Sequence, residues 1–260
     1  MDVAAYISEL RTNGALLSDA AARTALDEPV PPCPGWRVRD LLKHTGMVHR
    51  WAAANITRAC AEPMTADEQR EAVGRYPPDE SLADWFRSGH ARLVGVLEAA
   101  DPGLQCWTFM PAPSPLAFWA RRQAHETTIH RVDAETARGR HSAAGRITPV
   151  PAAFAADGID ELLTAFLPRV LRHAPPDGMA CELAVRARDT GHEWLVKFGP
   201  EPAGAPRGDA RAACRISGAA SDLYQLLWNR LGEPPAGADV EGDAGVLTAW
   251  HQNIQVKWRR

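Results

Sequence analysis

The sequence has few cysteines, few lysines and no long hydrophobic run. Its five cysteines are spread along the chain without a CxxC pair, which argues against a disulfide framework and a sulfur-rich zinc site and favours a cytoplasmic setting. No stretch approaches the roughly 18 apolar residues that a membrane-spanning helix needs, and the acidic start of the chain is unlike a signal peptide. Only three of the 29 basic residues are lysines, and no basic run is present. We therefore expect neither a nucleic-acid nor a membrane partner.

The composition is otherwise that of an ordinary globular protein. The 260 residues are 45% hydrophobic and 23% charged, and 29 basic against 32 acidic residues give a net charge of −3. This much apolar surface excludes disorder over most of the chain. The length allows one large domain or two of roughly 100–150 residues each. The excess of arginine over lysine is typical of a GC-rich bacterial genome, which bears on source and not on function.

Helical periodicity dominates the first half of the chain. Apolar residues recur three and four positions apart in four long segments, which predicts four amphipathic helices. We expect a capping box from Ser81 to Asp84 near the start of the third. Four such helices favour a four-helix bundle over residues 1–145. The periodic segments are 1–26, 38–61, 81 onward and 116–138.

The period changes to two in the second half. Alternating runs at 181–188 and 194–198 flank the turn Asp189-Thr190-Gly191, which is the pattern of a β-hairpin. The pattern therefore predicts an α+β domain over residues 150–260. Its other expected elements are a helix at 157–170, a strand at 210–216, a helix at 223–231, a strand at 239–241 and a helix at 243–256.

The densest group of chemistry-bearing residues lies in the last of the four N-terminal helices. His125 and His130 are five positions apart, so at about 100° per residue they diverge by roughly 140° and do not form a zincin motif. Glu126 and His130 are four apart and share a face, and Arg122 and Asp133 extend this polar stripe. A carboxylate and an imidazole on one face can supply two ligands of a divalent metal.

A third ligand is required, since a catalytic zinc usually takes three protein ligands and keeps one open position. His44 is the best candidate, because it shares the apolar face of the second helix with Val48 and Trp51. The spacing leaves two interpretations open. Either His44 joins Glu126 and His130 around one ion, or His44 is a hydrogen-bonded core histidine and the other two form an ion pair.

Other side chains have simpler interpretations. Arg122 is suited to hold a substrate carboxylate with paired hydrogen bonds, although a salt bridge is the commoner role. Trp51 is the tryptophan that we expect beside a pocket, and core packing is expected for the others. His49 and His125 are expected outside the metal site. No cysteine has a basic neighbour that would make it a nucleophile, and Cys33 between prolines is expected to be buried.

Six short segments of the sequence can be compared with the motifs of known protein families. They are CPGWRVRDLLKHTGMVHRWAA (33–53), WTF (107–109), FWARRQAHETTIHRVDAE (118–135), DGIDE (157–161), SGAASDLYQLLWNRLG (217–232) and VEGDAGVLTAW (240–250). Together, in this order, they resemble the mycothiol-dependent maleylpyruvate isomerase family. That family belongs to the DinB-like helical-bundle metalloenzymes of actinobacteria. The resemblance covers nearly the whole chain.

The resemblance implies a fold and a set of site residues. The N-terminal part is expected to be a DinB-like four-helix bundle and the C-terminal α+β domain to be sterol-carrier-like. A divalent metal, usually zinc, is implied at His44, Glu126 and His130. Asp133 and Arg230 match positions implicated in catalysis in the isomerase branch, with Arg230 reaching toward the metal from the C-terminal domain. The alternatives are that Asp133 orients a metal ligand and that Arg230 caps its helix.

The resemblance also implies a reaction type. A thiol cosubstrate, mycothiol in this family, is activated by the metal and used for isomerisation or S-transfer on a small electrophilic molecule. Two alternatives stay open, namely metal-assisted hydrolysis with bound water and a non-catalytic role as a metal sensor or apolar-ligand binder. We expect a cytoplasmic monomer or small homo-oligomer.

Overall fold

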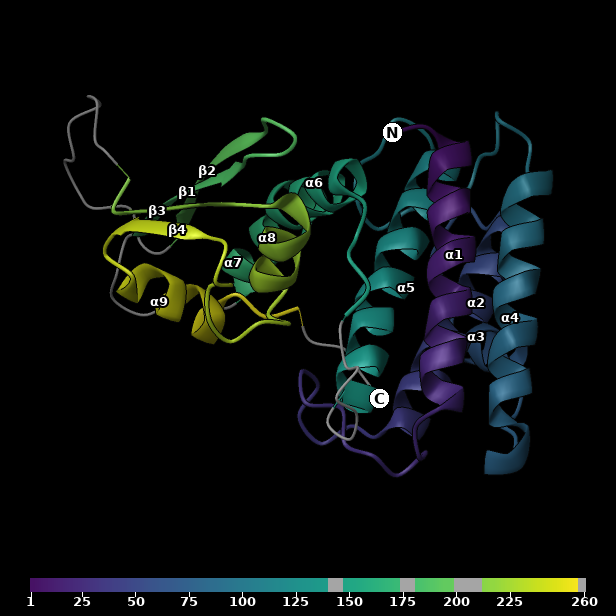
Figure 1. Cartoon of the computed structure of the whole chain (residues 1–260). Coiled ribbons are helices and arrows are strands. Elements are labelled where there is room, and N and C mark those ends of the chain that lie inside the picture. Colours follow the sequence, from purple (N-terminus) through teal and green to yellow (C-terminus); the bar gives the residue numbers. More distant parts are fainter. Residues whose placement is uncertain (140–146, 174–180, 199–211, 257–260) are drawn as a thin grey trace. The chain divides into compact units, whose positions relative to one another are not determined.

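A computed structural model describes residues 1–139, 147–173, 181–198 and 212–256 (Figure 1). These residues form two compact units, one within residues 1–148 and the other within residues 149–259. Among the described helices, none is both long enough and apolar enough to cross a membrane.

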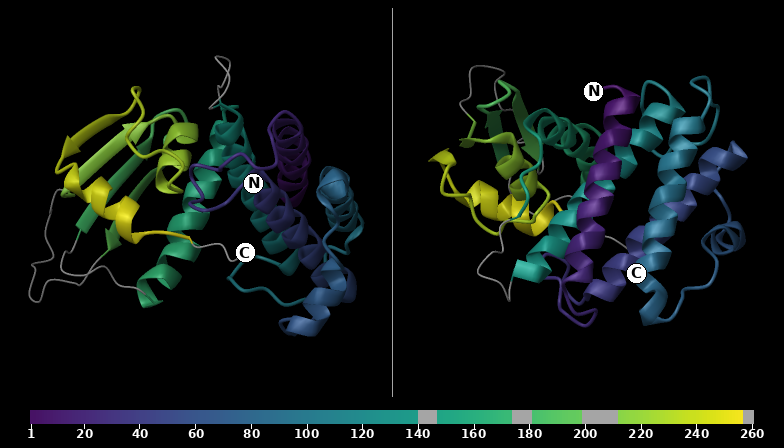
Figure 2. Two further views of the ribbon diagram at one scale, coloured as in Figure 1. Left: turned by 90° about the horizontal axis from the view of Figure 1, so that it is seen from below. Right: turned by 45° about the vertical axis from the view of Figure 1, so that its right-hand side comes forward.

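The described part of the first unit is helical, as the periodicity predicts. Its four long helices lie side by side (Figure 2), with α1 against α4 and α5 and with α2 against the same two helices. A short helix in the connector after α2 was not predicted. Its start is a capping box in which Thr65 and Glu68 satisfy each other's backbone N–H groups. The helices are α1 (Val3–Ala22), α2 (Val38–Arg58), α3 (Ala66–Val73), α4 (Asp79–Ala99) and α5 (Pro115–Gly139).

Helix α1 ends at Ala22, four residues before the predicted end, and two further helix ends differ from the prediction for local reasons. The expected capping box at Ser81 is wrong, because α4 begins two residues earlier, after Pro78, without a side-chain cap. Asp79 and Glu80 instead place negative charge in the first turn, where it is favourable. The second difference is at the C-terminal end of α2. There Ala59 adopts a left-handed conformation (φ 46°), so the helix ends before residue 61, where the prediction placed its end.

The second unit combines helices with a four-stranded sheet. The strand order is β2-β1-β3-β4, with β1 antiparallel to β2 and parallel to β3, and β3 antiparallel to β4. The β1–β2 hairpin is the one that the alternating pattern predicts. The strands are β1 (Cys181–Ala187), β2 (Glu193–Phe198), β3 (Cys214–Gly218) and β4 (Asp239–Gly242).

The helices of this unit are shifted from their predicted ranges. The helix expected at 157–170 begins at Ala152 and contains one π-helical turn, η1 (Leu162–Phe166). The expected strand start at Ala210 lies outside the described residues. The last helix is shorter than expected at both ends. The helices are α6 (Ala152–Glu161), α7 (Leu167–His173), α8 (Ala220–Leu227) and α9 (Gly245–Asn253).

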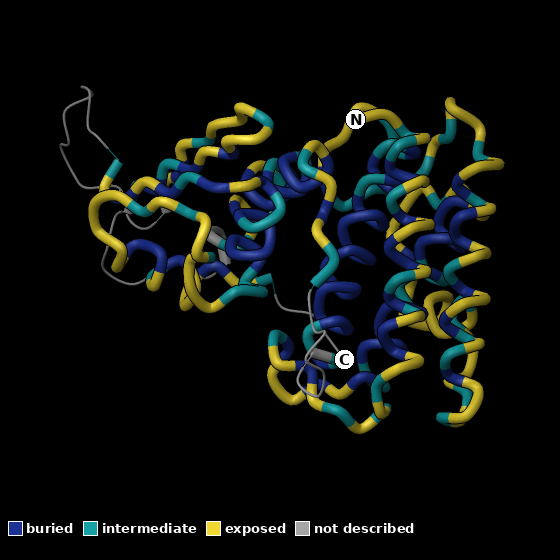
Figure 3. The backbone as a smooth tube through the Cα atoms, viewed as in Figure 1, coloured by how far each residue is buried: buried dark blue, intermediate teal, exposed yellow. Residues whose placement is uncertain are grey.

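Burial is most complete along α5. Every residue from 122 to 135 is buried, and Figure 3 shows this helix dark along most of its length. Ionisable side chains in this stretch are at most 4% exposed and have almost no access to bulk water. Such groups are costly unless they are paired or bind a ligand, so the polar stripe predicted on this helix requires partners.

Candidate metal centre

Helices α2 and α5 bring His44, Glu126 and His130 together. The Nε2 atom of His44 lies 3.1 Å from Oε1 of Glu126, and Nε2 of His130 lies 3.2 Å from the same oxygen. The two imidazole rings are 5.0 Å apart, centre to centre. His44 is 8% exposed, whereas Glu126 and His130 are 2% and 0% exposed. His44 is therefore the most exposed of the three.

The electrostatics of Glu126 favour its ionised form. Its second oxygen, Oε2, accepts a hydrogen bond from Nη2 of Arg122 at 3.0 Å. Burial by itself would raise the pKa of Glu126, but hydrogen bonds from His130 and His44 and the charges of His130 and Arg122 hold it well below its usual value. The carboxylate is thus available as an acceptor or a ligand on its Oε1 side.

The donor set fits a divalent metal such as zinc. Two imidazole nitrogens and one carboxylate oxygen are the ligand types of catalytic zinc sites. Ligands about 2.0–2.1 Å from a tetrahedral ion lie about 3.3 Å from one another, which is close to the two nitrogen–oxygen distances found here. The ligand atoms of His44, Glu126 and His130 all lie within 4.8 Å of one another. The same distances are those of hydrogen bonds and ion pairs, so the geometry fits both interpretations that the sequence leaves open.

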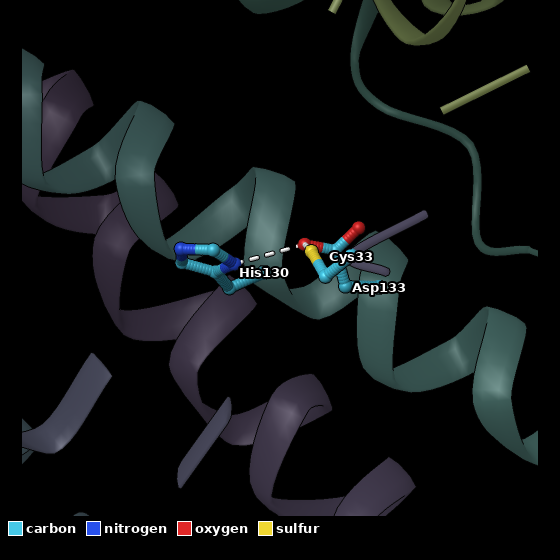
Figure 4. Close-up of side chains that lie close together, drawn as sticks. All are labelled: Cys33, His130 and Asp133. Atoms are coloured by element: carbon cyan, nitrogen blue, oxygen red, sulfur yellow. Dashed lines mark hydrogen bonds and ion pairs between the residues drawn. The ribbon is translucent and has the colours of Figure 1, made fainter. Parts of the chain in front are cut away.

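His130 has a second partner on its other ring nitrogen. Its Nδ1 atom lies 2.8 Å from Oδ2 of Asp133, one turn along α5, and Asp133 is completely buried (Figure 4). Burial would lower the pKa of His130, but the hydrogen bonds with Asp133 and Glu126 and their negative charges raise it. A carboxylate that holds Nδ1–H leaves Nε2 as the ligand atom. This geometry favours an orienting role for Asp133.

The loop before α2 contributes two further contacts that the sequence did not reveal. The thiol of Cys33 donates to Oδ2 of Asp133 at 3.4 Å, and Cys33 is buried as expected. The ring of Trp36 stacks on that of His130, with 6.1 Å between the ring centres, and forms a T-shaped contact with the ring of His44, with 5.0 Å between the centres. Both residues lie in the run CPGW, but nothing in a single sequence links that run to a side chain 100 residues away.

The remaining predicted residues lie in different surroundings. Trp51 is half-buried among Trp107, Phe109 and Trp119, and its indole nitrogen has no hydrogen-bond partner among the described residues. Arg230 follows α8 in the second unit, where its Nη1 donates to the carbonyl of Trp228 at 2.8 Å. That contact is the one expected of a helix-capping arginine.

The histidines expected outside the centre have other neighbours. His49 lies on α2 with its Nε2 2.9 Å from the hydroxyl of Thr127, and His125 packs edge-on against Tyr6. A groove of about 530 Å³ between the start of α1 and the end of α4 contains none of the predicted site residues.

Comparisons with known proteins agree with this fold. The model of the mycothiol maleylpyruvate isomerase N-terminal domain matches residues 7–135, and that of the MDMPI C-terminal domain matches residues 153–249. A crystal structure of the mycothiol-dependent maleylpyruvate isomerase is similar at 13% identity with a TM-score of 0.62. The crystal structure of a histidine-to-alanine mutant of that enzyme is similar at 12% identity with a TM-score of 0.63. Each alignment covers 92% of this chain and 93% of the isomerase chain. No curated protein matches the sequence significantly. The two domain models, in order and over most of the length, show that this chain belongs to the mycothiol maleylpyruvate isomerase family.

Proposed function

We propose that this chain is a metal-dependent enzyme that uses mycothiol for isomerisation or S-transfer on a small electrophilic substrate. The observation that carries the proposal is the convergence of two imidazoles on one oxygen of a buried carboxylate, at His44, His130 and Glu126. Family membership supports the thiol, because the structural relatives are named as mycothiol-dependent isomerases. We also propose that residues 1–145 form a DinB-like four-helix bundle and residues 150–260 a sterol-carrier-like domain.

The ligands of the proposed centre would be His44, Glu126 and His130, with zinc as the favoured ion. A bound divalent ion supplies positive charge that lowers the pKa of a thiol placed beside it. The protein residues around it have separate tasks. Arg122 binds Oε2 of Glu126 and keeps that carboxylate ionised, so its earlier assignment to substrate binding is the weaker one. Asp133 keeps the proton of His130 on Nδ1.

Substrate recognition is assigned to residues beyond the ligands. Trp51 presents a half-buried indole surrounded by other aromatic rings, which suits it as an apolar wall. Arg230 is proposed as the cation that stabilises negative charge developing on a substrate oxygen. Cytoplasmic location and a monomeric or small homo-oligomeric state complete the proposal.

Metal analysis and a thiol-dependent assay test the proposal together. The zinc-loaded protein is incubated with mycothiol and a cis keto-acid of the maleyl type, and separately with alkylating electrophiles. Isomerisation forms the trans product with no net loss of thiol, whereas S-transfer consumes thiol and yields a conjugate visible by mass spectrometry. Isomerisation that persists without thiol would overturn the thiol assignment, and formation of a cleaved, hydrated product without thiol would favour hydrolysis with bound water.

Variants identify the ligands. We expect His44→Ala and Glu126→Gln to weaken zinc binding by more than about 100-fold, since even residues behind the ligands contribute 10- to 100-fold. The matched control is His49→Gln, which alters another buried histidine of α2 and should keep full zinc stoichiometry. Zinc retained at full stoichiometry by His44→Ala would remove His44 from the centre.

A further inference from the structure

We propose that Cys33 is a positioning residue of the candidate metal centre. Its thiol holds the Asp133 carboxylate, which in turn orients His130. This inference rests on the proposed metal site and adds a residue to it from the loop before α2.

The backbone around Cys33 is fixed by short-range hydrogen bonds. An isolated bridge joins Pro29 to Arg37, and Val30 N–H donates to the carbonyl of Trp36 at 2.9 Å. Within that bridge, Cys33 N–H donates to Val30 and Trp36 N–H donates to Cys33, at 3.0 and 2.9 Å. The loop is thus a closed turn, and backbone bonds from Val38 and Arg39 to the carbonyls of Glu28 and Leu26 join it to the start of α2.

The Cys33 side chain points toward the oxygen that already binds His130. Oδ2 of Asp133 accepts from Nδ1 of His130 at 2.8 Å and from the thiol of Cys33 at 3.4 Å, and Figure 4 shows the sulfur beside the carboxylate. Asp133 is 0% exposed, so its charge depends on donors supplied by the protein. A thiol is a weak donor, but here the thiol and the imidazole both donate to the same carboxylate. We call this hydrogen-bonded chain of Cys33, Asp133 and His130 the relay.

The same loop holds the imidazole from a second side. The ring of Trp36 stacks on His130 with an interplanar angle of 17° and lies edge-on to His44. Trp36 therefore restricts the ring plane of His130, while Cys33 acts on its Nδ1 through Asp133. Two contacts from one closed turn fix the orientation and the tautomer of a proposed ligand that lies on a different element.

Cys33 is better placed to orient than to bind the ion itself. The ligand atoms of Cys33, Asp133 and His130 also lie within 4.8 Å of one another. However, an ion there would use Nδ1 of His130, whereas the ion at Glu126 uses Nε2. Both ions together would require His130 to lose both ring protons. With Nδ1–H committed to Asp133, the thiol remains a hydrogen-bond donor.

The zinc affinity of Cys33 variants tests the relay. Affinity is measured by competition with a chromophoric chelator, and the cobalt(II) absorption spectrum reports the ligand geometry. We expect Cys33→Ala to weaken zinc binding about 10-fold, at the lower end of the effect of residues that orient ligands, and to shift the cobalt spectrum. Cys33→Ser keeps a donor to Asp133 and should stay within about threefold of the unmodified protein.

Controls separate this role from packing and from ligation. Cys214→Ala removes a buried thiol of β3 in the other unit and should leave zinc affinity unchanged. In the double variant Cys33→Ala/Asp133→Asn, the loss should equal that of Asp133→Asn alone, because both changes break one relay. The proposal would be overturned if Cys33→Ser bound zinc as weakly as Cys33→Ala, or if the losses of affinity in the double variant were additive. It would also be overturned if Cys33→Ala bound no zinc at all.

A failure of this inference is distinguishable from a failure of the metal site. If Glu126→Gln binds zinc normally, the metal site is wrong and the relay falls with it. If Glu126→Gln loses zinc while Cys33→Ala binds zinc as tightly as the unmodified protein, only the role of Cys33 is wrong. Melting temperatures of the metal-free variants, measured alongside, show whether Cys33→Ala folds, and Cys33→Ser provides the test if it does not.

Discussion

The two units place their charges in opposite environments. On α5, residues 122–135 are all buried, yet this stretch carries two arginines, two glutamates, an aspartate and two histidines. On the sheet, the charges are paired across neighbouring strands and face solvent, as in Arg186–Glu193 and Arg215–Glu241, where every partner is more than half exposed. The same residue types therefore carry a large desolvation cost on α5 and a small one on the sheet.

Buried and exposed charges differ in what they contribute to stability. A buried charge pays a large desolvation penalty that its partner often fails to repay, so a helix with several such charges is an inefficient way to gain stability. Exposed pairs carry little penalty and contribute little. The sheet charges are explained by solubility and strand pairing. On α5, stability alone does not explain Glu126, His130 and Asp133, and the ion that we propose there would give them a function.

Not all of the buried charge on α5 belongs to the candidate centre. Arg131 donates to Glu135 at 2.8 Å, to Asn13 at 3.1 Å and to the carbonyl of Thr148. Glu135 in turn accepts from the backbone and hydroxyl of Thr148. This second network ties the chain after α5 to α1 and α5, so it is structural.

The largest effect is expected from breaking that network. Arg131→Met removes the positive partner and leaves Glu135 buried with an uncompensated charge. We expect the free energy of unfolding of the metal-free protein to fall by about 3–5 kcal/mol. Chemical denaturation measures it. The double variant Arg131→Met/Glu135→Gln should recover part of this loss of stability, because neither residue of the pair is then charged. If the single and double variants lost the same free energy of unfolding, lost packing of the Arg131 side chain, and not the unpaired charge of Glu135, would be the main cause.

The main elements of both units were predictable because they depend on local periodicity. The four long helices and the hairpin follow from apolar residues repeating at 3.6 or at 2 positions. Boundaries were less predictable. The end of α2 is set by the left-handed conformation of Ala59, an ordinary alanine in the sequence. Helix α3 is too short and too polar for periodicity to reveal it, and only its Thr65–Glu68 capping box signals it.

The candidate site was predictable only in part, for a similar reason. The spacing of four between Glu126 and His130 fixes their common face in any α-helix, and His44 follows from its position on an apolar face. Contacts made by loops carry no such periodic signal. Cys33 reaches Asp133, and Trp36 reaches His130, through a closed turn whose orientation depends on tertiary packing. A single sequence gives no means of deriving that contact.

The buried histidine His49, outside the candidate centre, should make the stability of the protein depend on pH. Burial and the nearby charge of His90 lower the pKa of His49 well below its ordinary value of 6.5. The unfolded chain therefore takes up a proton near pH 6.5 that the folded state excludes. Stability is fully present above that pH and falls on acidification, by up to about 1.4 kcal/mol per pH unit for this one group.

The measurement is the free energy of unfolding between pH 7.5 and 5, in the presence of a chelator so that metal release does not contribute. We expect the slope for His49→Gln to be shallower than that of the unmodified protein below pH 6.5. His192→Gln removes an exposed histidine near the β1–β2 turn and serves as the control. Identical slopes for His49→Gln and the unmodified protein would show that His49 takes up its proton without unfolding.

The smallest effect is expected on the sheet, where it completes the comparison with α5. Arg215 on β3 faces Glu241 on β4 across the sheet at 3.7 Å, with side chains that are 54% and 72% exposed. Water and salt screen such a pair, and both side chains lose rotamer freedom in holding it. A double-mutant cycle with Arg215→Ala and Glu241→Ala should give a coupling energy of about 0.2–1 kcal/mol, which falls further in 1 M salt. Both are arginine–glutamate pairs, but Arg131 is buried and also bonds Asn13 and Thr148, whereas Arg215 is exposed. A coupling energy as large as the loss in Arg131→Met would contradict the distinction between the two units.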